Sequence, residues 1–129
     1  MKKIILMLVL SLFVGTSLAT DWTKVSSNDN FTAYAERASI TKTGTTTQMW
    51  GLFDDATWNT IHNVSYMSAG VLYEFDCESK QFRVLQAVAY SRHMGAGKIV
   101  DSSSVPSRLE DVNDHGSSGV LWKIACSKG

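Results

Sequence analysis

The chain alternates with a period of two from residue 71 to residue 77, and no other feature of the sequence constrains its fold as strongly. Successive side chains of a β-strand point to opposite faces, so one face of this segment carries Val71, Tyr73, Phe75 and Cys77. The opposite face carries Leu72, Glu74 and Asp76. The pattern predicts a β-strand with an apolar face that holds a cysteine at its end.

Short turns between several of the expected strands predict an antiparallel meander. The strands that we expect cover residues 31–36, 38–42, 45–53, 71–77, 82–92 and 98–100. Turns at Gly44, at residues 78–81 and at residues 95–97 connect them. If Cys77 faces Phe82 across the hairpin, the apolar face of the cysteine also receives Phe82, Val84, Val88 and Tyr90.

The C-terminal residues 120–126 have the spacing of a short helix. Two pairs of apolar residues lie four positions apart and form adjoining stripes: Leu121 with Ala125, and Trp122 with Cys126. Ser117 or Ser118 can cap the first turn. We therefore expect an α+β domain, a single antiparallel sheet with this helix against one face.

Two further segments have weaker patterns. Residues 101–119 contain six serines, one proline and two glycines, which predicts a long surface connection with little regular structure. Residues 54–68 contain Trp58, Ile61 and Val64, and a short helical turn and an ordered loop are both compatible with them. The sequence leaves these two alternatives open.

The first nineteen residues have the pattern of a secretory signal peptide. The basic start Lys2–Lys3 precedes an apolar run over residues 4–14, and Ser17 and Ala19 are the small residues expected before a cleavage site. A membrane anchor is the alternative, but a bilayer span needs roughly twenty apolar residues. We expect cleavage after Ala19 and, because no cysteine directly follows the apolar run, no lipid anchor. The domain over residues 20–129 is then exported, to the periplasm, the cell surface or the medium.

The two cysteines, Cys77 and Cys126, both lie in this exported part. Export delivers them to an oxidising compartment, and neither belongs to a Cys-x-x-Cys motif nor has a histidine nearby. A disulfide is therefore favoured over a free reactive thiol or half of a metal site. Closing a loop of about fifty residues would stabilise the domain by on the order of 4 kcal/mol.

The charge balance makes nucleic acid an unfavourable partner. Residues 1–19 hold two lysines and no acidic residue, so the remaining chain has ten Lys and Arg against twelve Asp and Glu. Proteins bind nucleic acid mainly by neutralising phosphates with clustered Lys and Arg. The length of the exported part is that of one domain.

Glu74 and Asp76 are the candidate catalytic pair, since they lie on one strand face about 7 Å apart. Two carboxylates at this separation are typical of glycoside hydrolases and also of calcium sites. The alternative is a solvated or ion-paired sheet face, with Arg83 on the next strand as partner. We favour the ion-paired face and assign no catalytic residue.

No other motif indicates a cofactor. The three histidines, His62, His93 and His115, lack the local spacing of metal ligands. Residues 116–119 lack the context of a serine nucleophile, and residues 95–98 lack the spacing of a phosphate-binding loop. We expect neither a metal nor a cofactor.

Large aromatic side chains are the remaining candidates for a binding surface. The segment 49–53 carries apolar residues on both faces, so the C-terminal helix can cover only one of them. The uncovered face is a candidate binding or dimer surface. Trp50, Trp58 and Tyr66 are the candidate residues, with burial in the core as the alternative for each.

Taken in order, several short motifs resemble the surface-adhesin E domain family of exported bacterial proteins. They are Trp22 and Val25, Tyr34-Ala35-Glu36 with Ser39-Ile40, Met49-Trp50-Gly51-Leu52 with Asp54, Glu74-Phe75-Asp76-Cys77, Phe82-Arg83-Val84-Leu85, Tyr90-Ser91, Gly95-Ala96-Gly97, Gly116-Ser117 and Ile124-Ala125-Cys126. They span nearly the whole exported part.

The resemblance implies an antiparallel sheet of about six strands, with a C-terminal helix tied to it by the Cys77–Cys126 bond. It also implies a non-enzymatic role in adhesion to host or matrix proteins, and dimerisation through the sheet. Two features differ from the family: no lipid-attachment cysteine is present, and residues 54–68 contain two acidic residues and no Lys or Arg.

Three hypotheses follow for function. The leading one is an exported, disulfide-closed binding module of the adhesin E type, with a host matrix protein or an envelope protein as partner. The second is a periplasmic or envelope protein that binds another ligand. The third is an envelope hydrolase that uses Glu74 and Asp76, which would require a raised pKa on one carboxyl.

Overall fold

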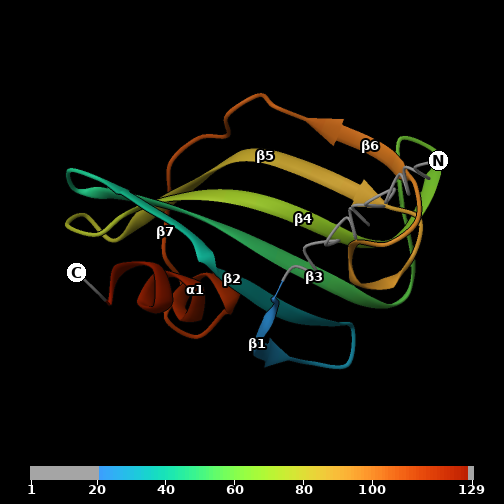
Figure 1. The fold of residues 1–129 in the computed structure, drawn as a ribbon, viewed down its shortest axis with the longest axis horizontal. Helices are drawn as coiled ribbons and strands as arrows, with labels where there is room; N and C mark the ends of the chain where they lie inside the picture. Colours follow the sequence, from blue (N-terminus) through green and yellow to red (C-terminus); the bar gives the residue numbers. More distant parts are fainter. Residues whose placement is uncertain (1–20, 128–129) are drawn as a thin grey trace, which may run out of the picture.

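The computed structural model describes residues 21–127, which form one antiparallel sheet with a helix packed against it (Figure 1). The elements are β1 (Thr23–Ser27), β2 (Phe31–Thr43), β3 (Thr46–Ile61), β4 (Val64–Asp76), β5 (Gln81–Tyr90), β6 (Ile99–Ser103), β7 (Glu110–Asp111) and α1 (Ser117–Cys126). Strands β1 to β6 are neighbours in chain order, and β7 pairs with the first two residues of β5. The predicted α+β meander is confirmed. The predicted signal peptide lies outside the described residues.

Strands β3 and β4 form a long hairpin through the segment that the sequence left open. The β3 strand continues to Ile61 and β4 starts at Val64, so the helical turn and the ordered loop expected for residues 54–68 are both wrong. His62 and Asn63 connect the strands with positive φ angles of 47° and 63°. Two central residues with positive φ match the right-handed twist of a two-residue hairpin turn.

An irregularity in β3 bends this hairpin. Asp54 pairs with Ser68, but the next pair toward the turn is Asn59 with Tyr66. The extra residues on β3 form a bulge, and bulges bend the strand and re-aim its side chains. Trp58 belongs to this bulge and is 60% exposed.

A second bulge, at Leu85 in β5, decides which face each later side chain occupies. Phe82 pairs with Phe75 and not with Cys77. Val84 and Gln86 pair with Tyr73 and Leu72, which leaves Leu85 as the extra residue. Phe82 and Val84 therefore lie on the face of Phe75. The placement of Val88 and Tyr90 on that face is wrong, because one extra residue reverses the alternation.

Helix α1 covers the sheet face that carries Met49 and Phe75. Leu121 and Ala125 are buried with these residues in the core cluster. The stripe predicted from four-residue spacing is thereby confirmed. No helix in the described range is long and apolar enough to cross a membrane.

The start of α1 differs from the expectation. Gly116, in extended conformation, is the N-cap residue, and no side chain caps the helix. The predicted cap by Ser117 or Ser118 is wrong, because both serines lie inside the first turn. The Ser118 hydroxyl instead accepts a hydrogen bond from the Asn113 N–H (2.9 Å).

The end of α1 is bonded to the sheet. A disulfide joins Cys126, the last helical residue, to Cys77, which directly follows β4, with a Cα–Cα distance of 5.6 Å. One helical turn earlier, Trp122 Nε1 donates a hydrogen bond to the Asp76 carbonyl (3.1 Å). The predicted disulfide is confirmed, and it fixes the helix against the strand end.

The long connection before α1 is mostly irregular, as expected. It extends β6 to Ser103 and contributes the two residues of β7. Between them, Ser107 bonds both ways with Val84: its hydroxyl accepts from the Val84 N–H and its own N–H donates to the Val84 carbonyl, each at 2.8 Å. The outer edge of β5 is thus largely paired.

Candidate functional site

The sheet face opposite α1, here called the open face, is lined by alternate residues of the same strands that form the core. Its residues follow from the strand register: Trp50 pairs with Glu36 and with Leu72, and Leu52 pairs with Tyr34 and with Gly70. Met49 directly precedes Trp50 and Phe53 directly follows Leu52, so both point to the helix side. The candidate site lies on this open face.

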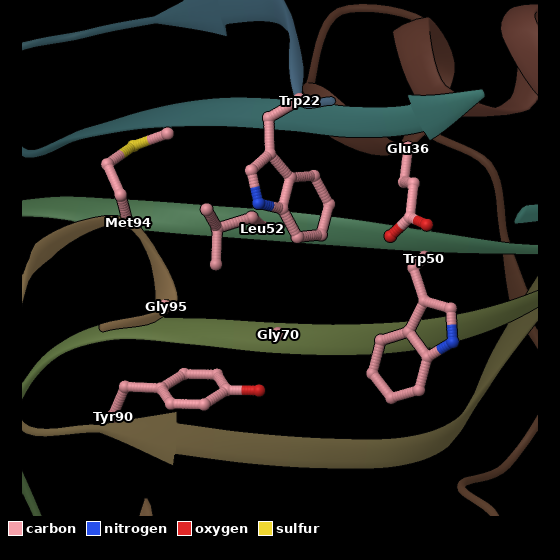
Figure 2. Close-up of a pocket in the computed structure, with 8 residues that line it drawn as sticks. All are labelled: Trp22, Glu36, Trp50, Leu52, Gly70, Tyr90, Met94 and Gly95. Atoms are coloured by element: carbon pink, nitrogen blue, oxygen red, sulfur yellow. The ribbon is translucent and has the colours of Figure 1, made fainter. Parts of the chain in front are cut away.

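A hollow of about 550 Å³ lies on the open face, here called the aromatic groove. Its lining residues are Trp22, Glu36, Trp50, Leu52, Gly70, Tyr90, Met94 and Gly95. Figure 2 shows the rings of Trp22, Trp50 and Tyr90 arranged around Leu52 and Gly70. Five separate stretches of the chain contribute, so the groove exists only in the folded sheet.

Gly70 forms part of the floor of the groove. A Cβ atom at this position would lie 3.5 Å from Tyr90 Cε2 and 3.7 Å from Trp50 Cζ3. The two rings therefore flank the space directly above the Gly70 backbone. The missing side chain keeps that space open.

One wall of the groove is the loop over residues 91–97, which carries Met94 and Gly95. Two side chains from the hairpin hold this loop in place. The Ser68 hydroxyl is buried, donates to the Arg92 carbonyl (2.6 Å) and accepts from the Gly95 N–H (2.8 Å). Asp54 Oδ1 accepts from the Met94 N–H (2.8 Å) and pairs with His93 Nδ1 (3.1 Å).

These anchors allow an unusual backbone at the rim. Met94 has φ 57°, a left-handed conformation that is costly for most side chains. The hydrogen bonds from Ser68 and Asp54 on either side of it fix this conformation. Met94 is consequently 40% exposed and borders the groove.

Glu36 is the one charged residue among those that line the groove. It is half-buried, and no Lys, Arg or His nitrogen within residues 21–127 forms an ion pair with it. Figure 2 shows its carboxylate directed toward the space beside Trp50. The groove is therefore aromatic with one unneutralised negative charge.

The three residues proposed from the sequence as a binding surface line three different hollows. Trp50 belongs to the aromatic groove. Trp58 lines a second hollow of about 560 Å³ with Met67 and His93. Tyr66 lines a third, of about 270 Å³. Burial raises the pKa of the Tyr66 hydroxyl, and the nearby charge of Asp55 adds to the shift.

Three residues that the groove brings to Trp50 were not among those proposed as the binding surface, namely Trp22, Tyr90 and Met94. Trp22 precedes Thr23, which pairs with Ala35, so the register places the indole on the open face beside Glu36. Tyr90 was assigned to the wrong face because the Leu85 bulge has no sequence signature. The turn predicted at Gly95-Ala96-Gly97 indicated a loop next to Met94 but not where the side chain of Met94 would lie.

The two carboxylates of the hydrolase hypothesis are engaged in local contacts. Arg83 Nε donates to Glu74 Oε1 at 2.9 Å, which is the ion pair expected as the alternative. Asp76 Oδ1 accepts from the N–H groups of Ser79 and Glu78, and these bonds hold the pKa of Asp76 below its ordinary value. This shift is opposite to the one that an acid catalyst requires.

The histidines lie apart from one another. His62 pairs with Asp101 at 2.9 Å, His93 pairs with Asp54, and His115 lies in the connection before α1. Within the described range, no group of three or more His, Cys, Asp or Glu side chains is placed to hold a metal ion.

Comparisons with known proteins agree with this architecture. The family model for surface-adhesin protein E matches residues 22–127. No curated protein is significantly similar to the chain in sequence.

Solved structures of Haemophilus influenzae protein E are similar to this chain. Crystal form II has a TM-score of 0.65 at 12% identity, over 84% of this chain and 91% of that one. Another structure of Haemophilus influenzae protein E has a TM-score of 0.64 at 12% sequence identity, over 84% of this chain and 88% of that one. Protein E from non-typeable Haemophilus influenzae has a TM-score of 0.58 at 11% sequence identity, over 87% of this chain and 79% of that one. At this identity the likeness concerns the fold.

Proposed function

This chain belongs to the surface-adhesin protein E family, and on that premise we propose that it is an exported adhesive module that binds a protein partner through the aromatic groove. The observation that carries this proposal is the groove itself. Three large rings from separate parts of the chain surround a hollow on the face that the helix leaves uncovered. The surface-adhesin protein E family is not a family of enzymes, so the proposed role is binding rather than catalysis.

The composition of the groove supports a role in protein recognition. Interface hot spots are enriched in Trp and Tyr, which bury a large area at low cost in conformational entropy. Methionine is over-represented at surfaces that adapt to several partners. The anchored loop also holds Met94 in place before binding, which reduces the ordering cost on association.

Export is part of the proposal. The pattern over residues 1–19 is that of a signal peptide. The Cys77–Cys126 disulfide supports a location outside the cytosol, because disulfides persist in oxidising compartments. We propose residues 20–129 as the exported domain and matrix or envelope proteins as its partners.

A surface-binding assay tests adhesion and the site together. The exported domain is applied to immobilised matrix proteins, and Trp50→Ala is compared with Trp58→Ala. Both variants remove an indole from β3, but only Trp50 lines the aromatic groove. We expect saturable binding that Trp50→Ala weakens by about tenfold or more and Trp58→Ala leaves unchanged.

Two results would contradict the proposal. If the domain binds no matrix protein saturably, the adhesive function is wrong. If Trp50→Ala and Trp58→Ala lose the same amount of binding affinity, the aromatic groove is not the binding site. Each variant must also be shown to be folded, and the near-ultraviolet circular dichroism of its remaining aromatic residues provides this control.

The size of the groove favours a second candidate function, a periplasmic binding protein for a small ligand. A hollow of about 550 Å³ is within the range of small-molecule sites, roughly 300–1,000 Å³. Location separates the two functions, since a protein confined to the periplasm cannot bind host proteins. Protease treatment of intact cells is the test: adhesion requires that the domain is cleaved, and the periplasmic function requires that it is protected.

A homodimer is a further occupant of the open face to consider. Light scattering of the purified domain measures the mass directly. A dimer that Trp50→Ala dissociates would mean that the groove binds a second copy, and a monomer leaves it free for another protein.

A further inference from the structure

The aromatic groove combines three rings with a single carboxylate, and this combination defines the chemistry of its occupant. We propose that the groove binds the positively charged side chain of a lysine or arginine presented by the partner protein. The inference rests on the proposed function of the groove as the partner-binding site. It adds which group of the partner enters the groove.

The aromatic lining of the groove suits a cation. The face of an aromatic ring carries negative charge density and attracts an ammonium or guanidinium group within about 6 Å of its centre. Above Gly70, Tyr90 Cε2 and Trp50 Cζ3 lie 3.5 Å and 3.7 Å from the position of a Cβ atom, so a group that enters there contacts two rings. The Trp22 indole lies on the opposite side of that space, over Leu52 (Figure 2).

The charge of the groove points the same way. Glu36 pairs across the strands with Trp50, so its carboxylate lies beside the rings. No cation of the described chain neutralises it. Glu74, on the same face, differs because Arg83 binds it at 2.9 Å. A positive group in the groove would gain both the rings and the free charge of Glu36.

The protein contains its own example of this interaction at a different place. The Lys80 ammonium lies 5.3 Å from the centre of the Trp122 ring, beside the disulfide-linked end of α1. This is the single cation–π pair within residues 21–127. Trp122 is thus occupied internally, whereas the rings of the groove are available to a cation from outside.

A titration with small probes tests the inference on the whole exported domain. The probes are N-acetyl-arginine amide and N-acetyl-lysine amide, with N-acetyl-norleucine amide as a neutral control of similar length. The readout is the indole N–H signal of each tryptophan in a nitrogen-15 NMR spectrum at low ionic strength. We expect the cationic probes to shift the Trp22 and Trp50 signals saturably and to leave those of Trp58 and Trp122 in place.

The neutral probe and a matched pair of variants determine whether charge is the cause. The norleucine probe should bind at least about fivefold more weakly, as the loss of a cation–π contact implies. Glu36→Gln should weaken the cationic probes about threefold, the size of a partly exposed ion pair. Glu74→Gln removes a carboxylate of the same face that is already paired, and it should have no effect.

The contrary results are equally specific. If norleucine binds as tightly as lysine, or if Glu36→Gln has no effect, the groove accepts apolar groups and the inference is wrong. The outcome is separable from that of the proposed function. If matrix binding depends on Trp50 but not on Glu36, the groove is the adhesive site but does not bind a cationic side chain. If the groove binds the cationic probes and the domain binds no matrix protein, the cation site is supported and the adhesive function is wrong.

Discussion

The two faces of the sheet use tryptophan in opposite ways. On the helix side, Trp122 donates its indole N–H to the Asp76 carbonyl and carries Lys80 over its ring. On the open face, Trp50 has neither a hydrogen bond from its indole nor a cation among the described residues, and its ring borders a hollow. Both indoles are half-buried, so burial alone does not separate structure from function. The two indoles differ in their partners: Trp122 has a hydrogen-bond acceptor and a cation within the protein, and Trp50 has neither among the described residues.

The alternation of β3 produces this difference directly. Met49 is fully buried under α1, and the next residue, Trp50, points to the open face. The same strand therefore contributes to stability through one residue and to the groove through the next. Variants on the two faces should separate these effects.

The largest expected effect is on the covered face, at the disulfide. Replacing Cys77 and Cys126 together by serine should lower the free energy of unfolding by about 4 kcal/mol, because the unfolded chain is no longer constrained. Urea unfolding of the oxidised protein and the double variant measures the change. A loss below about 1 kcal/mol would mean that the bond does little to stabilise the helix on the sheet.

A pair of variants contrasts the covered core with the floor of the groove. Leu121→Ala should destabilise the protein by about 3 kcal/mol, since it leaves a cavity under α1. Gly70→Ala adds one methyl group at ordinary contact distance from Tyr90 and Trp50.

We therefore expect Gly70→Ala to change stability by less than about 1 kcal/mol and yet to weaken binding in the groove. Stability comes from chemical denaturation and affinity from the surface-binding assay. Normal binding by Gly70→Ala, or normal stability of Leu121→Ala, would contradict the division between the two faces.

Asp55, in the bulge of β3, gives a pH-dependent test. Burial raises its pKa above the ordinary value of 3.8, the charge of Asp54 adds to the shift, and Asn59 and His93 oppose it. Its Oδ2 atom is buried without a hydrogen-bond partner. The folded protein therefore binds the proton more tightly than the unfolded chain, and stability falls as the pH rises from 3.8 through the raised pKa.

Asp55→Asn should remove this fall. At pH 7 the variant should be more stable than the parent by about 1 kcal/mol, because the amide carries no charge to desolvate in the buried site, and the two should converge at acidic pH. Thermal unfolding across the pH range measures both. Equal stability at neutral pH would show that the Asp55 carboxylate is solvated in the folded state.

The smallest effect is expected at Trp58. Its side chain is 60% exposed and lies outside both the core cluster and the aromatic groove. Trp58→Ala should change stability by less than about 0.5 kcal/mol, as is usual for surface substitutions. A larger loss in urea unfolding would indicate that the bulge of β3 depends on this ring.

The sequence predicted the elements that depend on local pattern and composition. The alternation before Cys77 defined the second half of β4, the four-residue spacing of Leu121 and Ala125 defined the buried stripe of α1, and the two cysteines indicated their bond. The first two signals lie in short stretches of chain, where side-chain period and helical spacing suffice to find them. The bond between the cysteines was inferred from their number and from the expected export of the chain.

The aromatic groove could not be predicted in the same way. Its membership depends on strand register, and the single extra residue at Leu85 reverses the face of Tyr90. Its wall depends on long-range hydrogen bonds from Asp54 and Ser68 that hold Met94 in a left-handed conformation. Local propensity contains no information on such contacts.

Hydroxyl-radical footprinting of the domain, free and bound to the matrix protein found in the surface-binding assay, tests the central claim most directly. Oxidation rates of individual tryptophan and methionine side chains report their solvent access. We expect binding to reduce the rates at Trp22, Trp50 and Met94 and to leave the rate at Trp58 unchanged. Protection of Trp58 with no change at Trp50 would show that the partner binds elsewhere and would contradict the account.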